Sequence, residues 1–297
     1  MAMRIAITGG AGFLGLACGL RLSADGHRIM ALDRGEHVLP AGIDFRSCDI
    51  ADDNDVDSAF AEFEPDVVIH FAALLTLDSK ADIVAATRVN ALGTAVVFSA
   101  AQTCGARRVV YASSVAALGD ADTRAGDATT PRPASVYGAT KAFCEHLARA
   151  CVADTPEMTL IGLRYGSVYG PGRARGWRAI QTLVEQAVSG VPRLFYPDFP
   201  QPIDWTWIGD AAEVAARAVT APLSGHHVFN VVGDKRFMRE AADHLKQRYP
   251  SLTTIPQSAQ TPPSAWDFAN DGLEAALGYT PHTKMEGGID QMIDGLV

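Results

Sequence analysis

A tyrosine and a lysine with the spacing of a proton-transfer pair stand in the segment SVYGATK, at Tyr137 and Lys141. The surrounding residues, 135–153, have apolar side chains at intervals of three and four, which predicts a helix. Residues four apart on a helix share one face, so the two side chains can act together. An adjacent ammonium favours the ionised form of a phenol, which suits a tyrosine to act as an acid or base. The pair predicts proton transfer at an alcohol or carbonyl, with chance spacing as the alternative.

Two neighbouring hydroxyls, Ser113 and Ser114, end the segment RRVVYASS, whose β-branched residues predict a strand. Ligand crevices of parallel sheets form at the carboxyl ends of the strands, so a hydroxyl there can hold a substrate oxygen. Serines in this position also form turns through hydrogen bonds to the backbone, which is the alternative interpretation.

A glycine-rich turn, TGGAGFLG, follows the first expected strand. Gly9 would permit a sharp turn, Gly12 a close approach of a pyrophosphate to the backbone, and Gly15 close packing of helix on strand. The helix that begins here would offer the pyrophosphate the N–H groups of Phe13 and Leu14 and the positive end of its dipole. The turn therefore predicts a dinucleotide-binding site.

An acidic residue, Asp33, ends the second expected strand, where it can accept hydrogen bonds from the ribose hydroxyls of the adenosine. A carboxylate there would repel a 2′-phosphate, so the sequence favours NAD over NADP. Arg34 could stack on adenine or attract that phosphate, which leaves NADP as the less favoured alternative. Further residues after expected strands could line the cofactor or simply pack closely: Asp49, Ile50, Phe71, Ala72 and Ala73.

The elements that must position these residues alternate along the first half of the chain. β-Branched segments lie at 4–8, 27–33, 43–49, 65–73, 107–114 and 158–166, and helical patterns lie at 12–24, 53–63, 90–104 and 135–153. This alternation predicts βαβ units and a doubly wound parallel sheet, a Rossmann-like α/β fold. We assign residues 1–165 to an NAD-binding domain. Residues 166–297, where Gly, Pro and aromatic residues are dense, are expected to form a smaller substrate lobe, from which 204–232 could return to the main sheet.

Arginines and tryptophans of the lobe are candidate substrate contacts. Arg173 and Arg178 could bind a carboxylate or a phosphate, with a solvated surface as the alternative for both. Trp205 and Trp207 alternate as on a strand and therefore face the same side. Such rings can stack on a sugar face, here assigned to Trp205, although at least one ring is expected to pack in the core of the lobe.

Six segments occur along the chain in this order: TGGAGFLG, VIHFAA, NALGT, YASS, YGATK and LRYGSVYGPG. Through these segments the chain resembles the extended short-chain dehydrogenase/reductase superfamily, the branch that contains nucleotide-sugar epimerases and dehydratases. The resemblance implies that Tyr137 is the acid/base, that Lys141 binds the nicotinamide ribose and assists Tyr137, and that Ser114 orients the substrate oxygen, with Ser113 as the close alternative. It further implies a supporting role for Asn90, a position near the nicotinamide for Tyr165, and a homodimer.

The chain departs from the branch that binds nucleotide-diphosphate sugars. Its members commonly have an Asn and an Arg where this chain has Ser167 and Ile203. Losing such an Arg removes a charge-assisted contact worth about 1.5–3 kcal/mol, so a diphosphate substrate is less favoured. We therefore expect an NAD-dependent oxidoreductase that acts at a secondary alcohol or ketone of a sugar, sugar acid or polyol-like substrate.

Three other functions remain as alternatives. The first is a nucleotide-sugar epimerase with transient hydride transfer. A dehydratase is less favoured, because Val115 and Ala116 follow Ser114 where such enzymes usually have an Asp and a Glu. The last is a non-catalytic dinucleotide-sensing protein, which typically lacks the Tyr and Lys pair.

Composition narrows the partners. The 297 residues include 25 Lys plus Arg and 34 Asp plus Glu, and the formal net charge of −9 disfavours binding to nucleic acid. No stretch approaches the roughly 20 unbroken apolar residues of a membrane span, and the N-terminal segment lacks the pattern of an export signal. The five cysteines form no C-x-x-C pair and the eight histidines no metal-binding spacing. We expect a cytoplasmic protein with free thiols and no metal site.

Overall fold

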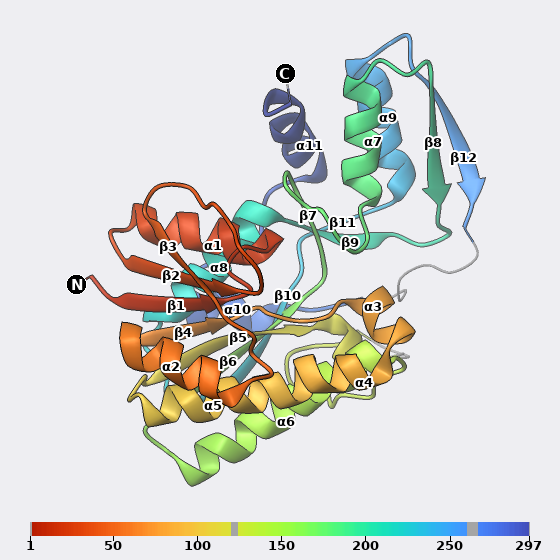
Figure 1. Ribbon diagram of the computed structural model, residues 1–297. Helices are drawn as coiled ribbons and strands as arrows, with labels where there is room; N and C mark the ends of the chain where they lie inside the picture. Colours follow the sequence, from red (N-terminus) through yellow and green to blue (C-terminus); the bar gives the residue numbers. More distant parts are fainter. Residues whose placement is uncertain (1, 120–123, 260–266, 297) are drawn as a thin grey trace.

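The larger part of the molecule is a parallel sheet between two layers of helices. A computed structural model describes residues 2–119, 124–259 and 267–296. Seven strands follow the order β10-β6-β5-β4-β1-β2-β3, and every neighbouring pair is parallel (Figure 1). The strands are β1 Arg4–Thr8, β2 Arg28–Asp33, β3 Ile43–Ser47, β4 Val67–His70, β5 Arg108–Ser114, β6 Thr159–Tyr165 and β10 Gly225–Val231. This is the doubly wound α/β fold that the alternation of segments predicted.

Helices cover both faces of this sheet (Figure 1). One layer contains α1 Phe13–Ala24, α8 Ile208–Thr220 and α10 Asp271–Leu277, and the other contains α2 Asp53–Phe63, α5 Gly93–Thr103 and α6 Val136–Asp154. The central strand β4 is buried at all four positions, as expected of a strand that is covered on both sides. Apolar side chains of both layers form two cores, one on each face.

The strand order reverses between β1 and β4, which pair in register from Ile5 with Val67 to Thr8 with His70. In an open α/β sheet, ligands bind in the crevice at the carboxyl ends of the strands at this switch point. The glycine turn after β1 and the segment after β4 both begin there. The topology therefore places the predicted cofactor residues at one edge.

A long helical segment follows β4, made of α3 Thr76–Ala81, α4 Ile83–Ala86, a π-helix at Thr87–Leu92 and α5. By length and composition alone, Ile83–Thr103 could cross a membrane. However, α5 packs against α2 and α6, and its Val97 and Phe98 lie in a core of the α/β domain. We therefore interpret α5, the C-terminal half of this segment, as a core helix of the α/β domain.

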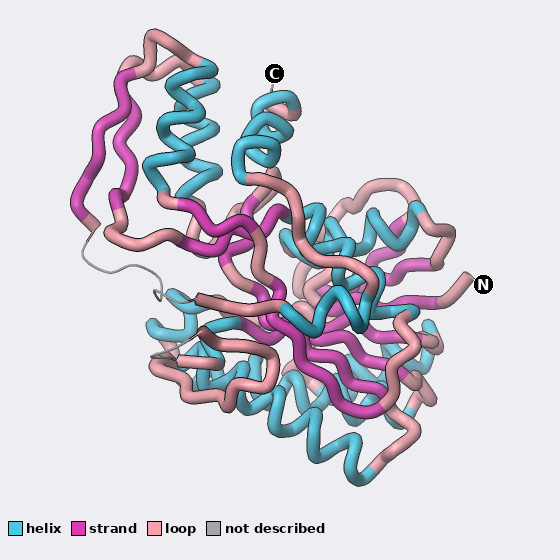
Figure 2. Tube along the Cα trace, turned by 180° about the vertical axis from the view of Figure 1, so that it is seen from behind, coloured by secondary structure: helices cyan, strands magenta, loops and turns pink. Residues whose placement is uncertain are grey.

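The remaining elements form a smaller lobe with a core of its own (Figure 2). Its strands are β7 Ser167–Tyr169, β9 Ile203–Trp207 and β11 Asp234–Arg236 in one sheet, and β8 Arg193–Asp198 and β12 Thr253–Ser258 in another. Its helices are α7 Ala179–Val188, α9 Met238–Arg248 and α11 Met285–Asp294. Residues 208–231 leave the lobe, because α8 packs on α1 and β10 pairs with β6.

Candidate active site

The glycine turn is compressed between α1 and the segment that follows β4. Gly9 has a φ of +68°, and a Cβ atom at this position would lie 2.6 Å from the Ala72 nitrogen. A Cβ atom at Gly15 would lie 2.1 Å from the carbonyl oxygen of Gly9. Both contacts are too short for any side chain. Glycine is therefore required at these positions for the turn and for the packing of α1, as predicted.

The first turn of α1 has the features of a binding site for the phosphates of a dinucleotide. Gly12 is the N-cap of α1, and no side chain of the described residues caps the helix. The free N–H groups of a helix N-terminus, such as those at Phe13 and Leu14, attract anions. At the end of β2, the carboxylate of Asp33 accepts hydrogen bonds from the backbone nitrogens of Ala11, at 3.2 Å, and Arg34, at 2.9 Å. A carboxylate held beside the turn fits a dinucleotide with a free adenosine ribose.

The other predicted cofactor residues lie at neighbouring strand ends. The Phe71 nitrogen donates to the Thr8 carbonyl at 3.0 Å, which joins the segments after β1 and β4, and Ala72 and Ala73 follow. After β3, Asp49 accepts from the backbone of Ala51. The predicted cofactor residues differ in their exposure to solvent, since Ile50 is buried, Arg34 is exposed and Ala73 is half-buried.

Tyr165 ends β6, and its hydroxyl is bound to helix α8. The hydroxyl donates to the Ala211 carbonyl of α8 at 3.3 Å, and burial raises its pKa. Its ring contacts Phe71 edge to face, with the centroids 6.2 Å apart. Through Phe71, Tyr165 supports the wall of the crevice by packing.

Asn90 lies in the π-helix, is fully buried and acts as a clamp. Its Oδ1 accepts from the Leu74 nitrogen at 2.8 Å, and its Nδ2 donates to the Leu74 carbonyl at 3.0 Å and to Thr140 Oγ1 at 3.1 Å. These bonds tie the segment after β4 to helix α6. Asn90 therefore supports the site by positioning the segment after β4 relative to α6.

A buried histidine connects this clamp to the glycine turn. His70 Nδ1 lies 2.7 Å from Thr8 Oγ1, and His70 Nε2 lies 2.9 Å from Thr94 Oγ1. Because Thr94 donates its own proton to the Asn90 carbonyl, it must accept from Nε2, which leaves Nδ1 to accept from Thr8. Burial, and then the charge of Lys141, lower the His70 pKa to about 3. His70 is thus a neutral, satisfied core residue.

Tyr137 and Lys141 occupy the first turns of α6, and local interactions fix both. Ser135 caps the helix by accepting from the Gly138 nitrogen at 3.1 Å. Lys141 is only 2% exposed, and its Nζ donates to the Ala112 carbonyl at 2.8 Å. The same Nζ lies 5.7 Å from the centre of the half-buried Tyr137 ring. The structure therefore brings the pair together beside the carboxyl end of β5.

The two serines at the end of β5 have different partners. Ser113 Oγ donates to the buried Glu145 of α6 and is therefore occupied. Ser114 Oγ accepts from the Ala116 nitrogen at 3.2 Å and donates to no acceptor among the described residues, so its hydroxyl proton is available to a ligand. A Cβ atom at Gly138 would lie 2.2 Å from the Ala116 carbonyl oxygen, so the first turn of α6 is pressed against this segment. This packing supports Ser114, rather than Ser113, as the partner of Tyr137.

The residues of the lobe that the sequence suggested for the substrate have separate surroundings. Trp205 is 2% exposed, stacks on Trp177 at 4.8 Å, and donates from its indole nitrogen to the Arg236 carbonyl. It is a core residue of the lobe, and the expected stacking on a sugar is not supported. Arg178 pairs with Glu185 at 2.6 Å. Arg173 faces the glycine turn, with its guanidinium carbon 5.3 Å from the centre of the Phe13 ring.

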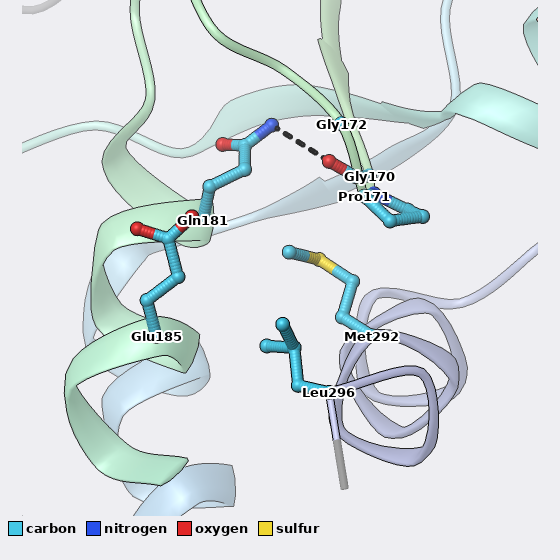
Figure 3. Close-up of a pocket in the computed structure, with 7 residues that line it drawn as sticks. All are labelled: Gly170, Pro171, Gly172, Gln181, Glu185, Met292 and Leu296. Atoms are coloured by element: carbon cyan, nitrogen blue, oxygen red, sulfur yellow. Dashed lines mark hydrogen bonds between the residues drawn. The ribbon is translucent and has the colours of Figure 1, made fainter. Parts of the chain in front are cut away.

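A small cavity of about 60 Å³ lies next to the loop that carries Arg173 (Figure 3). It is bounded by the segment Gly170–Gly172, by Gln181 and Glu185 of α7, and by Met292 and Leu296 near the C-terminus. The buried Gln181 donates to the Gly170 carbonyl at 3.4 Å, which anchors this loop to α7. Tyr137 and Lys141 do not line the cavity, so we interpret it as a packing gap of the lobe.

The position where the resemblance implies an arginine, Ile203, holds a buried aliphatic side chain. Ile203 is buried in the core of the lobe and lies opposite Arg236 in the pairing of β9 with β11. The guanidinium of Arg236 is occupied by three carboxylates, those of Asp234, Glu240 and Glu286. Arg236 is therefore no substitute for the missing arginine.

Sequence reasoning missed the residues that anchor helix α6 to strands β5 and β6. Glu145 forms two hydrogen bonds with the buried Arg164 of β6, at 2.8 and 2.7 Å, besides that with Ser113. Its position four residues after Lys141, on the same helical face, was the available signal. Thr8 and Thr94 were missed as well, and no spacing rule links them to His70.

Comparisons with known proteins agree with this geometry. The family model described as the NAD dependent epimerase/dehydratase family matches residues 5–232. The chain is 27% identical to the UDP-glucose 4-epimerase of Mycolicibacterium smegmatis, with 98% of each chain covered. Its structure is similar to that of the Thermus thermophilus UDP-glucose 4-epimerase in complex with NAD, with 30% identity, 98% of each chain covered and a TM-score of 0.84.

A second solved structure is similar to the same extent. MoeE5 in complex with UDP-glucose and NAD has 28% identity and a TM-score of 0.86, with 98% of this chain and 97% of that chain covered. The family model spans more than half of the chain, and the glycine turn, Asp33 and the Tyr137 and Lys141 pair lie within it. The chain therefore belongs to the NAD-dependent epimerase/dehydratase family of enzymes.

Proposed function

We propose that the protein is an NAD-dependent sugar epimerase, which oxidises a secondary hydroxyl of a carbohydrate substrate and then returns the hydride. The observation that carries this proposal is the pairing of Tyr137 with Lys141 at the carboxyl end of β5, the strand that also carries Ser114 and that neighbours β4 at the switch point of the sheet. The return of the hydride is supported by the relatives, which are UDP-glucose 4-epimerases.

Each of the three residues has a distinct task in this reaction. Ser114 donates its free proton to the substrate oxygen and so holds it. Tyr137 takes the proton of the same hydroxyl as the carbinol carbon is oxidised, and gives it back in the reverse step. Lys141, whose Nζ donates to the Ala112 carbonyl, lies beside the Tyr137 ring and would bind the nicotinamide ribose. When bound, NAD supplies the acceptor for the hydride.

A dehydrogenase that releases the oxidised product is the second candidate. It is favoured by Ile203, because the buried aliphatic side chain stands where a diphosphate-binding arginine is common, and by Arg236, whose charge is already neutralised. The substrate would then be a free sugar, sugar acid or polyol.

One experiment separates the two candidates. The purified protein with NAD is offered UDP-glucose, UDP-galactose and the corresponding free sugars, and both reduced nicotinamide and sugar products are followed. Epimerisation gives an isomerised nucleotide sugar without net cofactor reduction, whereas a dehydrogenase gives stoichiometric reduced cofactor. Turnover of none of these compounds or of free sugar acids and polyols would contradict both candidates.

We further propose a homodimer that forms through the helices following β4. Ile83, Val84 and Leu92 are 60%, 70% and 51% exposed and gather around one shallow apolar hollow. Exposed apolar patches of this kind mark interaction surfaces. Light scattering is expected to give twice the chain mass, and Val84→Glu is expected to give monomers, whereas Val38→Glu, at an exposed site elsewhere, should leave the dimer intact. A monomeric wild-type protein would contradict this proposal.

The cysteines support a reducing compartment such as the cytoplasm. All five are free thiols, and three of them, Cys18, Cys48 and Cys144, are buried. Burial raises the pKa of all three thiols, which keeps them protonated and unreactive. Thiol titration of the purified protein under denaturing, non-reducing conditions should count five free thiols.

A further inference from the structure

Arg173 has an unfilled hydrogen-bonding edge where it lies between β7 of the lobe and the start of α1. Its Nη1 donates to the Val168 carbonyl at 2.9 Å, while its buried Nε has no partner among the described residues. A guanidinium presents its donors in a planar fork. With Nη1 held by the backbone, the Nε side of the fork is the one left to bind a ligand.

Arg173 differs from the other arginines that pack into the described part of the molecule. Arg178 also has a buried Nε without a partner, but its charge is paired with Glu185. Arg164 forms two hydrogen bonds with the carboxylate of Glu145. Arg108 donates to three backbone carbonyls, those of Ala218, Val219 and Leu223. Arg173 forms no salt bridge with any carboxylate of the described residues and has a single carbonyl partner. A buried donor without an acceptor costs free energy, so a bound ligand is the natural source of the missing partner.

The surroundings of Arg173 indicate the charge of that ligand. Burial lowers the pKa of the guanidinium, whereas the Tyr137 hydroxyl lies within electrostatic range and acts in the opposite direction. The Phe13 ring, on which Arg173 stacks, begins α1 at the positive end of the helix dipole. Arg173 thus adds a desolvated positive charge to a region that already favours anions.

We propose that Arg173 binds a carboxylate of the substrate, so that the enzyme acts on acidic sugars, with the carboxylate close to the carbinol that Tyr137 deprotonates. This inference rests on the proposed function and specifies its substrate class. A carboxylate accepts two parallel hydrogen bonds from one edge of a guanidinium, which matches the free edge of Arg173. Ile203 supplies no cation and Arg236 is neutralised, so we assign the selection for charge to Arg173.

The test measures binding separately from turnover. Tyr137→Phe protein saturated with NAD is titrated by calorimetry with two matched pairs of probes, UDP-glucuronic acid with UDP-glucose and glucuronic acid with glucose. In at least one pair, we expect the acid to bind about 10- to 100-fold more tightly than the neutral sugar. Adding Arg173→Met should abolish this preference, and Arg173→Lys should retain only part of it, because lysine keeps the charge but not the fork.

Two controls keep the result specific. Arg175→Met removes an exposed arginine two residues away and should leave the preference for the acid unchanged. The dissociation constant of NAD is measured for every variant, since the pyrophosphate of the cofactor is the other anion that could reach Arg173. A loss of NAD affinity in Arg173→Met with an unchanged sugar preference would overturn the proposal and assign the residue to the cofactor.

The remaining outcomes distinguish this proposal from the proposed function. Equal binding of acid and neutral sugar by the starting protein would overturn the acidic-sugar proposal, while epimerase or dehydrogenase activity on the neutral sugar would still support the reaction. Conversely, tight binding of the acid that depends on Arg173, without turnover by the wild-type enzyme, would uphold the carboxylate site and contradict the proposed reaction.

Discussion

The buried ion pair between Glu145 of α6 and Arg164 of β6 gives the most specific prediction about how the candidate site is stabilised. Glu145 and Arg164 have side chains that are 5% and 3% exposed, and Glu145 also accepts from Ser113, next to Ser114, the serine that we propose to be catalytic. Glu145→Gln would keep the shape of the side chain but leave the Arg164 guanidinium without its opposite charge. Arg164 would then keep the bond from its Nη1 to the Asp127 carbonyl at 3.0 Å and at most one bond to the glutamine oxygen, and neither acceptor is charged.

Breaking a buried pair by removing one partner costs about 3–5 kcal/mol, because an uncompensated charge stays buried. Since folded proteins are typically stable by about 5–15 kcal/mol, this loss is large but measurable. Urea unfolding of NAD-free protein should therefore show Glu145→Gln to be less stable by about 3–5 kcal/mol. The variant should also lose turnover at saturating substrate, because α6 carries Tyr137 and Lys141.

A double-mutant cycle isolates the pair. Arg164→Met removes the stranded charge, so the double variant Glu145→Gln/Arg164→Met should be more stable than the sum of the single losses predicts. The matched control is Asp44→Asn, which breaks the exposed pair with Arg28 at 3.4 Å and should cost less than about 1 kcal/mol. If Glu145→Gln costs no more than Asp44→Asn, the reasoning is refuted.

Three further predictions test the cofactor crevice. Gly15→Ala should weaken NAD binding in a fluorescence titration by at least about tenfold, because its Cβ would lie 2.1 Å from the Gly9 oxygen. The control Gly287→Ala, whose Cβ would lie in open space, should bind NAD as wild type does, and equal affinities of the two variants would contradict the tight turn. Burial and Lys141 hold the His70 pKa at about 3, so only the unfolded chain gains this proton below pH ~6.5. As the pH is lowered from about 6.5 towards 3, the free energy of unfolding in urea should therefore fall more steeply for wild type than for His70→Asn, by about 1.4 kcal/mol per pH unit. Parallel pH curves for the two proteins would contradict the lowered pKa of His70. Asp33→Ser should narrow the preference for NAD over NADP in equilibrium binding, and an unchanged ratio would remove Asp33 from the ribose site.

The backbone of the crevice was predictable because glycines and strand ends leave local signals. Gly9 and Gly15 stand at positions where a Cβ atom would collide with the backbone, so no other residue fits. The spacing of Tyr137 and Lys141 likewise needs only the period of one helix. These features depend on short stretches of chain, which is why they leave a signal in the sequence.

Contacts between distant segments were not predictable in the same way. Ser113 and Ser114 are alike in sequence, and only the position of Glu145, 32 residues beyond Ser113, shows which hydroxyl is occupied. Trp205 was expected at the substrate because its ring is suited to stacking, but Trp177 covers it in the core of the lobe. No local pattern contains the positions of these partners, because they are set by how the lobe and the sheet pack.

The most direct test of the proposed chemistry is the absorbance of reduced nicotinamide after rapid mixing of NAD-loaded protein with sugars, acidic sugars and nucleotide sugars. We predict that wild type forms reduced cofactor, transiently in epimerisation or as a net product in dehydrogenation. Tyr137→Phe should slow this step about 10²- to 10⁴-fold while binding NAD as tightly as wild type. A Tyr137→Phe protein that reduces the cofactor at the wild-type rate would contradict the assignment of Tyr137 as the proton acceptor.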